Sequence, residues 1–140
     1  MALNIDCPGE DGLFGMHSIK PVGYEGATGN GTLDLVGFDV EIVDAATLCV
    51  WLINQRPPVD ASRKVLDSKE IWKIGVNATI DIFQLKRGEK EMCHVMTVAH
   101  PAIYSLNNLA FLGNDSFVIS NDHSGKSKRP LYMVSVCDFS

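Results

Sequence analysis

Two groups of amide and acidic side chains flank a predicted β-hairpin in the second half of this 140-residue chain. Asn107 and Asn108 stand just before one short apolar strand, and Asp122 and His123 follow the next. The Gly113-Asn-Asp-Ser116 segment between the strands is typical of a tight hairpin turn. Because such a turn returns the chain to the end where it started, we expect both groups at one rim of a sheet. Amide and carboxylate oxygens gathered there could bind a hard cation such as Ca²⁺.

The upstream chain predicts the strands that would position these groups. Residues 48–53 form a continuous apolar run, which is typical of a strand buried on both faces. Residues 35–43 alternate instead, so Phe38, Val40 and Ile42 are expected to face a core, with the acidic residues between them facing solvent. A four-stranded antiparallel meander is therefore predicted at 35–43, 48–54, 77–85 and 92–99.

The remaining segments have weaker patterns. Residues 1–32 are rich in glycine, and we interpret them as irregular, with one strand near Met16–Ile19. Residues 57–76 form a polar excursion with one helical turn near Ser68–Trp72. A second group of strands is predicted at 107–112, 116–121 and 131–136.

Composition excludes some classes of function. The net charge of −5 disfavours a nucleic-acid partner, which needs a basic patch. No apolar run approaches the roughly 20 residues of a membrane span, and the N-terminus has no pattern of a secretory leader. The cysteines form no C-x-x-C pair, so we expect no zinc site, and Cys49 and Cys93 are predicted to be buried free thiols.

An ordered series of motifs resembles the serum paraoxonase/arylesterase family. The series begins upstream with the runs 37–43, 50–57 and 77–83. It continues with His100-Pro-Ala-Ile103, Asn107-Asn-Leu-Ala110 and Ser116-Phe-Val-Ile-Ser-Asn-Asp-His123. The resemblance covers residues 33 to 136, which correspond to only part of a full-length member.

The resemblance implies a fold and an activity. Members are calcium-dependent six-bladed β-propeller hydrolases of aryl esters, lactones and organophosphates. We therefore expect an all-β chain with about one and a half to two four-stranded antiparallel blades. Residues 33–140 would form a partial propeller, with blade one at 35–99 and an incomplete blade two at 107–137. Because so few blades would leave apolar faces and strand edges uncovered, we expect the chain to be a fragment.

The resemblance also assigns roles to particular residues. Asn107 matches a ligand of the family's catalytic calcium. Asn108 matches a position where the family usually has an aspartate ligand of a structural calcium, and the backbone carbonyl of Phe38 is a further ligand candidate. Alternatively, Asn107 simply caps a turn before a strand. Because calcium takes six to eight oxygens, we do not expect this chain to hold the ion stably.

The family's proposed histidine dyad is absent from the matching positions, where Val36 and Gln55 stand. Neither residue can act as a general base near neutral pH. Asp122 and His123 are the remaining catalytic candidates. Alternatively, they form a strand-end turn in which Asp122 bonds local backbone amides. The other histidines are expected to be surface or packing residues: His17, His94 and His100.

Several functions remain open from the sequence. The first is a calcium-dependent arylesterase, lactonase or phosphotriesterase, of which this chain is a fragment with an incomplete site and a small ester or lactone as substrate. The second is a non-catalytic propeller fragment or pseudoenzyme that acts as an interaction module. The third is an unrelated small β-sandwich binding protein. The sequence does not determine whether the chain is an enzyme or what its oligomeric state is.

Three segments match the N-x-Ser/Thr pattern of glycosylation acceptors, at Asn30, Asn77 and Asn114. Such patterns are common by chance. Together with the resemblance, they lead us to expect a secreted or endomembrane parent protein.

Overall fold

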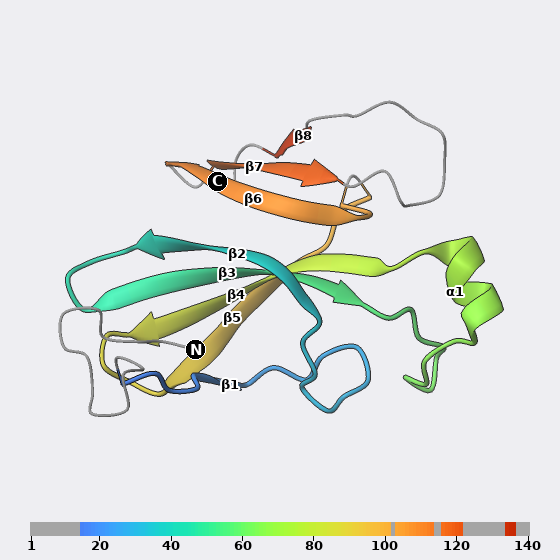
Figure 1. Cartoon of the computed structure of the whole chain (residues 1–140), viewed down its shortest axis with the longest axis horizontal. Coiled ribbons are helices and arrows are strands. Elements are labelled where there is room, and N and C mark those ends of the chain that lie inside the picture. Colours follow the sequence, from blue (N-terminus) through green and yellow to red (C-terminus); the bar gives the residue numbers. More distant parts are fainter. Residues whose placement is uncertain (1–14, 102, 114–115, 122–133, 137–140) are drawn as a thin grey trace.

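The computed structural model describes residues 15–101, 103–113, 116–121 and 134–136, with two β-sheets and one short helix in those ranges (Figure 1). The predicted all-β class is confirmed. The first sheet has five strands in the order β1-β5-β4-β3-β2, and the second has three in the order β6-β7-β8.

The four-stranded antiparallel meander in the first sheet is confirmed to within a few residues. Its strands are paired in sequence order, because each is followed by a connection that reverses the chain. They are β2 (Leu35–Ile42), β3 (Thr47–Arg56), β4 (Asn77–Lys86) and β5 (Glu91–Val98).

The fifth strand, β1 (Lys20–Val22), extends this sheet in an unexpected way. It pairs in parallel with β5, with Lys20 opposite Glu91, and the Lys20 Nζ–Glu91 Oε1 distance is 3.7 Å. The strand predicted near Met16 therefore begins four residues later. Parallel pairing joins segments far apart in sequence, so the local pattern alone does not reveal it.

The helical turn predicted after the prolines is confirmed as α1 (Ser68–Ile74). Asp67 caps its start, because its Oδ1 accepts a hydrogen bond of 2.9 Å from the Glu70 backbone N–H. Gly75 ends it at a φ of 82°, which a glycine adopts at little cost. Among the described residues, no helix has the length and apolar character needed to cross a membrane.

The predicted hairpin is confirmed in the second sheet. This sheet comprises β6 (Leu106–Gly113), β7 (Ser116–Asn121) and β8 (Val134–Val136), and the hairpin is formed by β6 and β7. Leu106 lies opposite Asn121, so the start of β6 and the end of β7 meet at one end of the hairpin. The two middle residues of the turn, 114–115, lie outside the described ranges.

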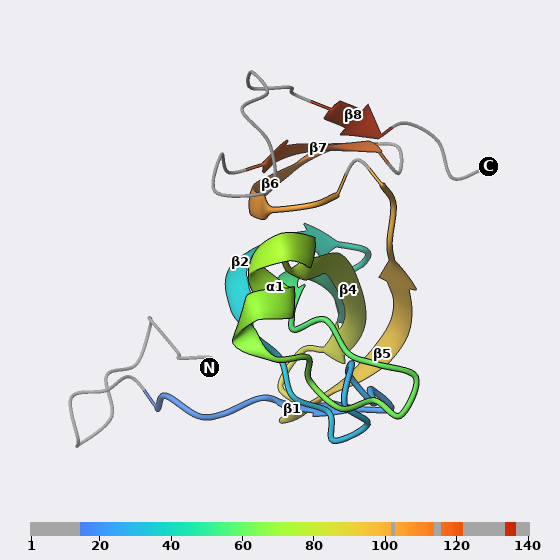
Figure 2. The ribbon, with the colours of Figure 1, turned by 90° about the vertical axis from the view of Figure 1, so that its right-hand side faces the viewer.

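The two sheets pack through an apolar core, and β6 runs beside β2 and reaches β3 (Figure 2). Trp51 of β3 is central to this core. Its ring centroid lies 4.5 Å from that of Phe111 and 5.4 Å from that of Phe117. Ile53 and Ile80, both fully buried, extend the same surface.

The burial of β2 is the reverse of the sequence-based prediction. The alternation is correct, but Phe38 and Ile42 are 66% and 68% exposed. Asp39 is half-buried, and its Oδ2 accepts a hydrogen bond of 3.0 Å from the Phe111 backbone N–H. The second sheet covers the acidic face of β2, whereas no described residue covers the apolar face.

The cysteine prediction is wrong for one residue. Cys49 is half-buried on β3, where burial and then the Glu41 carboxylate raise the pKa of its thiol. Cys93 is exposed on β5, although the strand around it is largely apolar. Nothing in the sequence pattern distinguishes the two cysteines, because both lie in largely apolar strand segments.

The core between the sheets generates a stability prediction. Phe117→Ala should lower the free energy of unfolding by about 3–5 kcal/mol, because it leaves a cavity beside Trp51. Leu112→Ala is the matched control: this side chain is 64% exposed, and the loss should stay within about 0.5 kcal/mol. Urea unfolding followed by tryptophan fluorescence measures both. Equal losses in the two variants would contradict this description of the core.

Candidate functional site

The strongest candidate site lies where the start of β6 meets β2. A Cβ atom built on Gly37 would stand 3.2 Å from the Asn107 backbone oxygen, so the two backbones approach closely there. Gln55 of β3 donates a hydrogen bond of 2.9 Å from Nε2 to the Leu106 backbone oxygen. Three strands therefore position this site, which we call the β2–β6 corner and define as Val36, Gly37, Phe38, Gln55, Asn107 and Asn108.

The two asparagines of the corner differ in their hydrogen bonding. Both are exposed. The Asn108 Oδ1 accepts a hydrogen bond of 2.9 Å from the Leu109 backbone N–H, so this oxygen already has a partner in the neighbouring backbone. The Asn107 side chain makes no hydrogen bond with the described part of the chain. Its amide can therefore bind a ligand as donor or as acceptor.

The corner does not fit a calcium ion by itself. Calcium takes six to eight oxygen ligands, several of them carboxylates. The corner supplies two neutral amides and the Phe38 backbone carbonyl. Within the described ranges, no group of three or more His, Cys, Asp or Glu residues could hold a metal. Asp122 and His123, the other predicted candidates, lie outside the described residues.

The corner also carries no general base. Val36 is apolar, and the Gln55 amide is already bonded to the Leu106 carbonyl. His94 lies elsewhere, half-buried on β5, with its ring centroid 5.0 Å from that of Tyr24 and 5.2 Å from that of Phe83. These contacts agree with the packing role expected for His94.

The outward side of the β6–β7 hairpin carries a shallow depression next to Asn108. Its volume is about 200 Å³, and small side chains such as Ala110 and Ser120 account for the space. At the corner end of the hairpin, Asn121 is buried, and its Oδ1 accepts from the backbone N–H groups of Tyr104 and Ser105, each at 3.3 Å. Asn121 therefore positions the chain entering β6.

A second polar cluster lies inside the first sheet, around Asp81, whose side chain is fully buried. Its Oδ2 accepts hydrogen bonds from the Tyr24 hydroxyl at 3.0 Å, the Asn54 amide at 2.9 Å and the Thr79 hydroxyl at 3.2 Å. Its Oδ1 accepts from the Thr97 hydroxyl at 2.5 Å. All the donors except Thr79 come from other elements, so this cluster joins β3, β4, β5 and the loop before β2.

Sequence reasoning missed this cluster. In residues 77–85, Asp81 stands between Ile80 and Ile82, an alternation that predicts a half-buried strand with Asp81 on the solvent side. In the structure both faces of β4 are covered, and Asp81 shares its face with Phe83 and Leu85, which form a second core. The irregular position of Phe83 in the alternation was the available signal for a second buried face.

The chain is similar in part to known proteins. Serum paraoxonase/arylesterase 1 of Rattus norvegicus is 25% identical over 120 residues, which are 83% of this chain and 29% of that protein. The Mus musculus protein of the same name is 32% identical over 47 residues, 34% of this chain and 13% of that protein. Serum paraoxonase/lactonase 3 of Oryctolagus cuniculus is 29% identical over 48 residues, 34% of this chain and 14% of that protein. Each match spans less than a third of the relative's length. No family model matches the chain.

The Asp81 cluster predicts a large effect on stability. Asp81→Ala should lower the free energy of unfolding by at least about 3 kcal/mol, because it leaves several buried donors without an acceptor. Asp34→Ala is the control, since that carboxylate is exposed and makes no hydrogen bond with the described residues. Urea unfolding measures both. A loss below about 1 kcal/mol for Asp81→Ala would contradict the proposed role of the cluster.

The same cluster predicts a pH dependence at high pH. Burial, and then the charge and hydrogen bond of Asp81, raise the pKa of Tyr24 to about 12, although Arg56 opposes the shift. Unfolded tyrosine titrates near pH 10. The stability that this bond provides is therefore fully present below pH 10 and is lost as the pH rises toward 12.

An absorbance titration of tyrosinate tests this shift. The late ionisation step near pH 12 should disappear in Tyr24→Phe and persist in Tyr104→Phe, which removes an exposed tyrosine. Persistence of the late step in Tyr24→Phe would assign it to another group.

Proposed function

We propose that this chain is part of a paraoxonase-related hydrolase that acts on ester or lactone bonds. The similarity over 120 residues to serum paraoxonase/arylesterase 1 of Rattus norvegicus carries the proposal. The names of the relatives supply the chemistry, which is hydrolysis of aryl esters or lactones. A small ester or lactone is the corresponding substrate.

The architecture we propose is that of a β-propeller. Blade one would comprise residues 35–99, and an incomplete blade two residues 107–137, after an irregular segment at 1–32. Two features support this architecture: β2 to β5 form a four-stranded antiparallel meander, and the chain then starts a second sheet beside the first strand of that meander. The exposed apolar strip of Phe38, Val40 and Ile42 on β2 is a face that a further sheet would cover.

Within this proposal, the β2–β6 corner contributes a contact to the substrate. The Asn107 amide is exposed and has no hydrogen-bond partner in the described chain, so its N–H can donate to an ester or lactone carbonyl. Such a donor stabilises negative charge that develops on the carbonyl oxygen. Because the corner has too few oxygen donors for calcium, we assign to Asn107 only this role as a hydrogen-bond donor.

A non-catalytic interaction module is the second function we propose, and one observation favours it. Gln55 stands where the resemblance places a catalytic histidine, and its amide is bonded to the Leu106 carbonyl. That bond gives Gln55 a structural role at the corner. Val36, at the other histidine position, cannot transfer a proton either.

The relatives are named as serum proteins. We therefore propose that the parent of this chain is secreted or resides in the endomembrane system. The glycosylation acceptor patterns agree with this location.

Hydrolysis assays distinguish the two functions. The purified chain is incubated with an aryl acetate and with a lactone, each with added Ca²⁺ and with a chelator. If the chain is a hydrolase, Asn107→Ala should lower the rate by about 10- to 100-fold, because it removes a donor to the carbonyl. The control is Asn77→Ala, which removes an exposed asparagine at the start of β4 and should leave the rate unchanged.

Two outcomes contradict the hydrolase proposal for this chain. One is hydrolysis at the same rate in Asn107→Ala and wild type. The other is no hydrolysis above buffer under any condition by a chain that melts cooperatively, which would favour the interaction module.

A further inference from the structure

The chain has two glycosylation acceptor patterns within the described residues, and they differ in how exposed the fold leaves them. Asn30-Gly-Thr32 lies in the loop between β1 and β2, whereas Asn77-Ala-Thr79 lies at the start of β4. Asn114 lies outside the described residues. A glycan acceptor needs an accessible asparagine amide and an accessible hydroxyl two residues later.

The loop that holds Asn30 is an exposed, tightly turned segment. Gly29 and Gly31 have φ values of 81° and 73°, which glycine adopts without strain. The Gly31 backbone N–H donates to the Glu25 backbone oxygen at 2.7 Å and closes the turn. Asn30 and Thr32 are both exposed on it.

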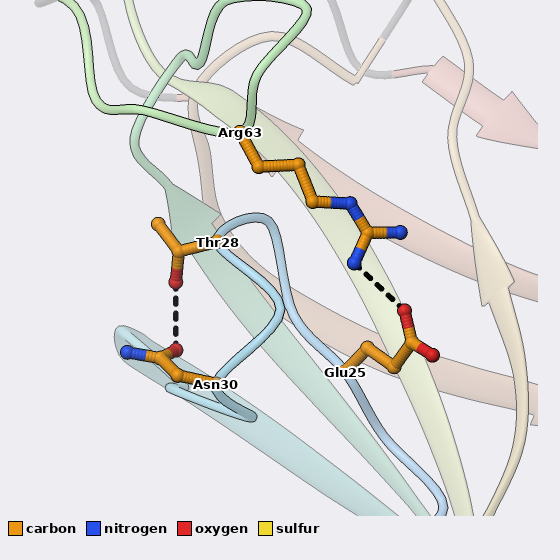
Figure 3. Close-up of polar contacts among 4 residues, drawn as sticks. All are labelled: Glu25, Thr28, Asn30 and Arg63. Atoms are coloured by element: carbon orange, nitrogen blue, oxygen red, sulfur yellow. Dashed lines mark hydrogen bonds and ion pairs between the residues drawn. The ribbon is translucent and has the colours of Figure 1, made fainter.

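Hydrogen bonds to its side-chain oxygen fix the orientation of the Asn30 amide. Its Oδ1 accepts from the Thr28 hydroxyl at 2.7 Å, the Thr32 hydroxyl at 2.6 Å and the Thr32 backbone N–H at 3.1 Å. Because a backbone N–H can only donate, the atom that faces it must be the oxygen. The Nδ2 is left without a partner among the described residues, and Figure 3 shows it turned away from Thr28.

A neighbouring loop supports this turn. Arg63 Nη1 lies 2.8 Å from Glu25 Oε2, in an ion pair between two exposed side chains (Figure 3). A Cβ atom on Gly29 would stand 3.0 Å from Arg63 Nη1, so the two loops are in contact there. The turn therefore has contacts that favour one conformation, even though it lies on the surface.

The Asn77 pattern is accessible only in part. The Asn77 side chain is exposed, but Ala78 and Thr79 are buried in β4. The Thr79 hydroxyl is fully buried and donates to Asp81 Oδ2 at 3.2 Å. An enzyme can reach this hydroxyl only when the strand opens.

We propose that Asn30 is an N-glycosylation acceptor of the folded chain and that Asn77 is not. The donor is an oligosaccharide linked to a polyprenyl diphosphate. The Asn30 Nδ2 forms the bond to C1 of the first sugar, the bond from C1 to the diphosphate oxygen breaks with its electron pair, and the amide gives up one proton to a base of the transferase. This inference does not depend on the hydrolase proposal.

This inference is tested by incubating the purified folded chain with an oligosaccharyltransferase and the polyprenyl-diphosphate oligosaccharide. Mass spectrometry of tryptic peptides separates the three asparagines, because lysine or arginine residues lie between them. We expect glycan at Asn30 with an occupancy at least about tenfold above that at Asn77, since modification of Asn77 requires local opening of a buried strand.

Matched variants isolate the acceptor geometry. Asn30→Gln and Thr32→Ala should each abolish the modified Asn30 peptide, and Thr32→Ser should retain it because the hydroxyl is kept. Asn77→Gln should leave the occupancy at Asn30 unchanged. Circular dichroism of each variant confirms that the sheets are intact. No glycan at Asn30 of the folded wild-type chain, or equal occupancy at Asn30 and Asn77, would overturn the inference.

Discussion

The fully buried carboxyl group of Asp81 is the constraint on which much of the first sheet depends. A buried polar group is tolerated only when hydrogen bonds replace its hydration. Here the donors come from Asn54 on β3, Thr97 on β5 and Tyr24 in the loop before β2, together with Thr79 on β4 itself. Each neighbouring element must therefore stand at one position relative to β4. A shift of one residue in either strand pair would move a donor to the opposite face.

The rest of the first sheet follows from the difference between its two faces. One face carries Trp51, Ile53 and Ile80 and packs against the second sheet. The other carries Leu52, Phe83 and the Asp81 cluster, and it is covered near β1 by the loop that contains Tyr24. That cover does not extend to β2, so its apolar strip is exposed. The sheet is thus covered on both faces along most of β4 and at the centre of β3, whereas β2 has one open face.

The difference between the two faces determines where the β2–β6 corner and the Asn30 turn lie. The β2–β6 corner lies at the end of the covered face, where Gly37 lets β6 approach and Gln55 holds the Leu106 carbonyl. Asn107 is left exposed there with an unused amide. The Asn30 turn belongs to the loop that carries Tyr24, so the buried Asp81 cluster and the ion pair to Arg63 both restrict that loop. One network of polar contacts therefore supports the turn that we propose as a modification site.

The sequence by itself determined the four strands of the meander, the order in which they pair and the hairpin, because these depend on local periodicity and turn chemistry. It identified the meander, the helix after Asp67 and the amides at the start of β6. It could not determine which face of a strand is covered. Phe38 was expected inside and is exposed, whereas Asp81 was expected outside and is fully buried.

Only the tertiary structure decided these points, because burial depends on which distant segment packs against a face. The second sheet covers the acidic side of β2, and the loop of Tyr24 covers the side of β4 that carries Asp81 and Phe83. The parallel pairing of β1 with β5 is equally non-local. The three-residue acceptor patterns at Asn30 and Asn77 are alike in sequence, and they differ because one lies on a surface turn and the other enters a buried strand.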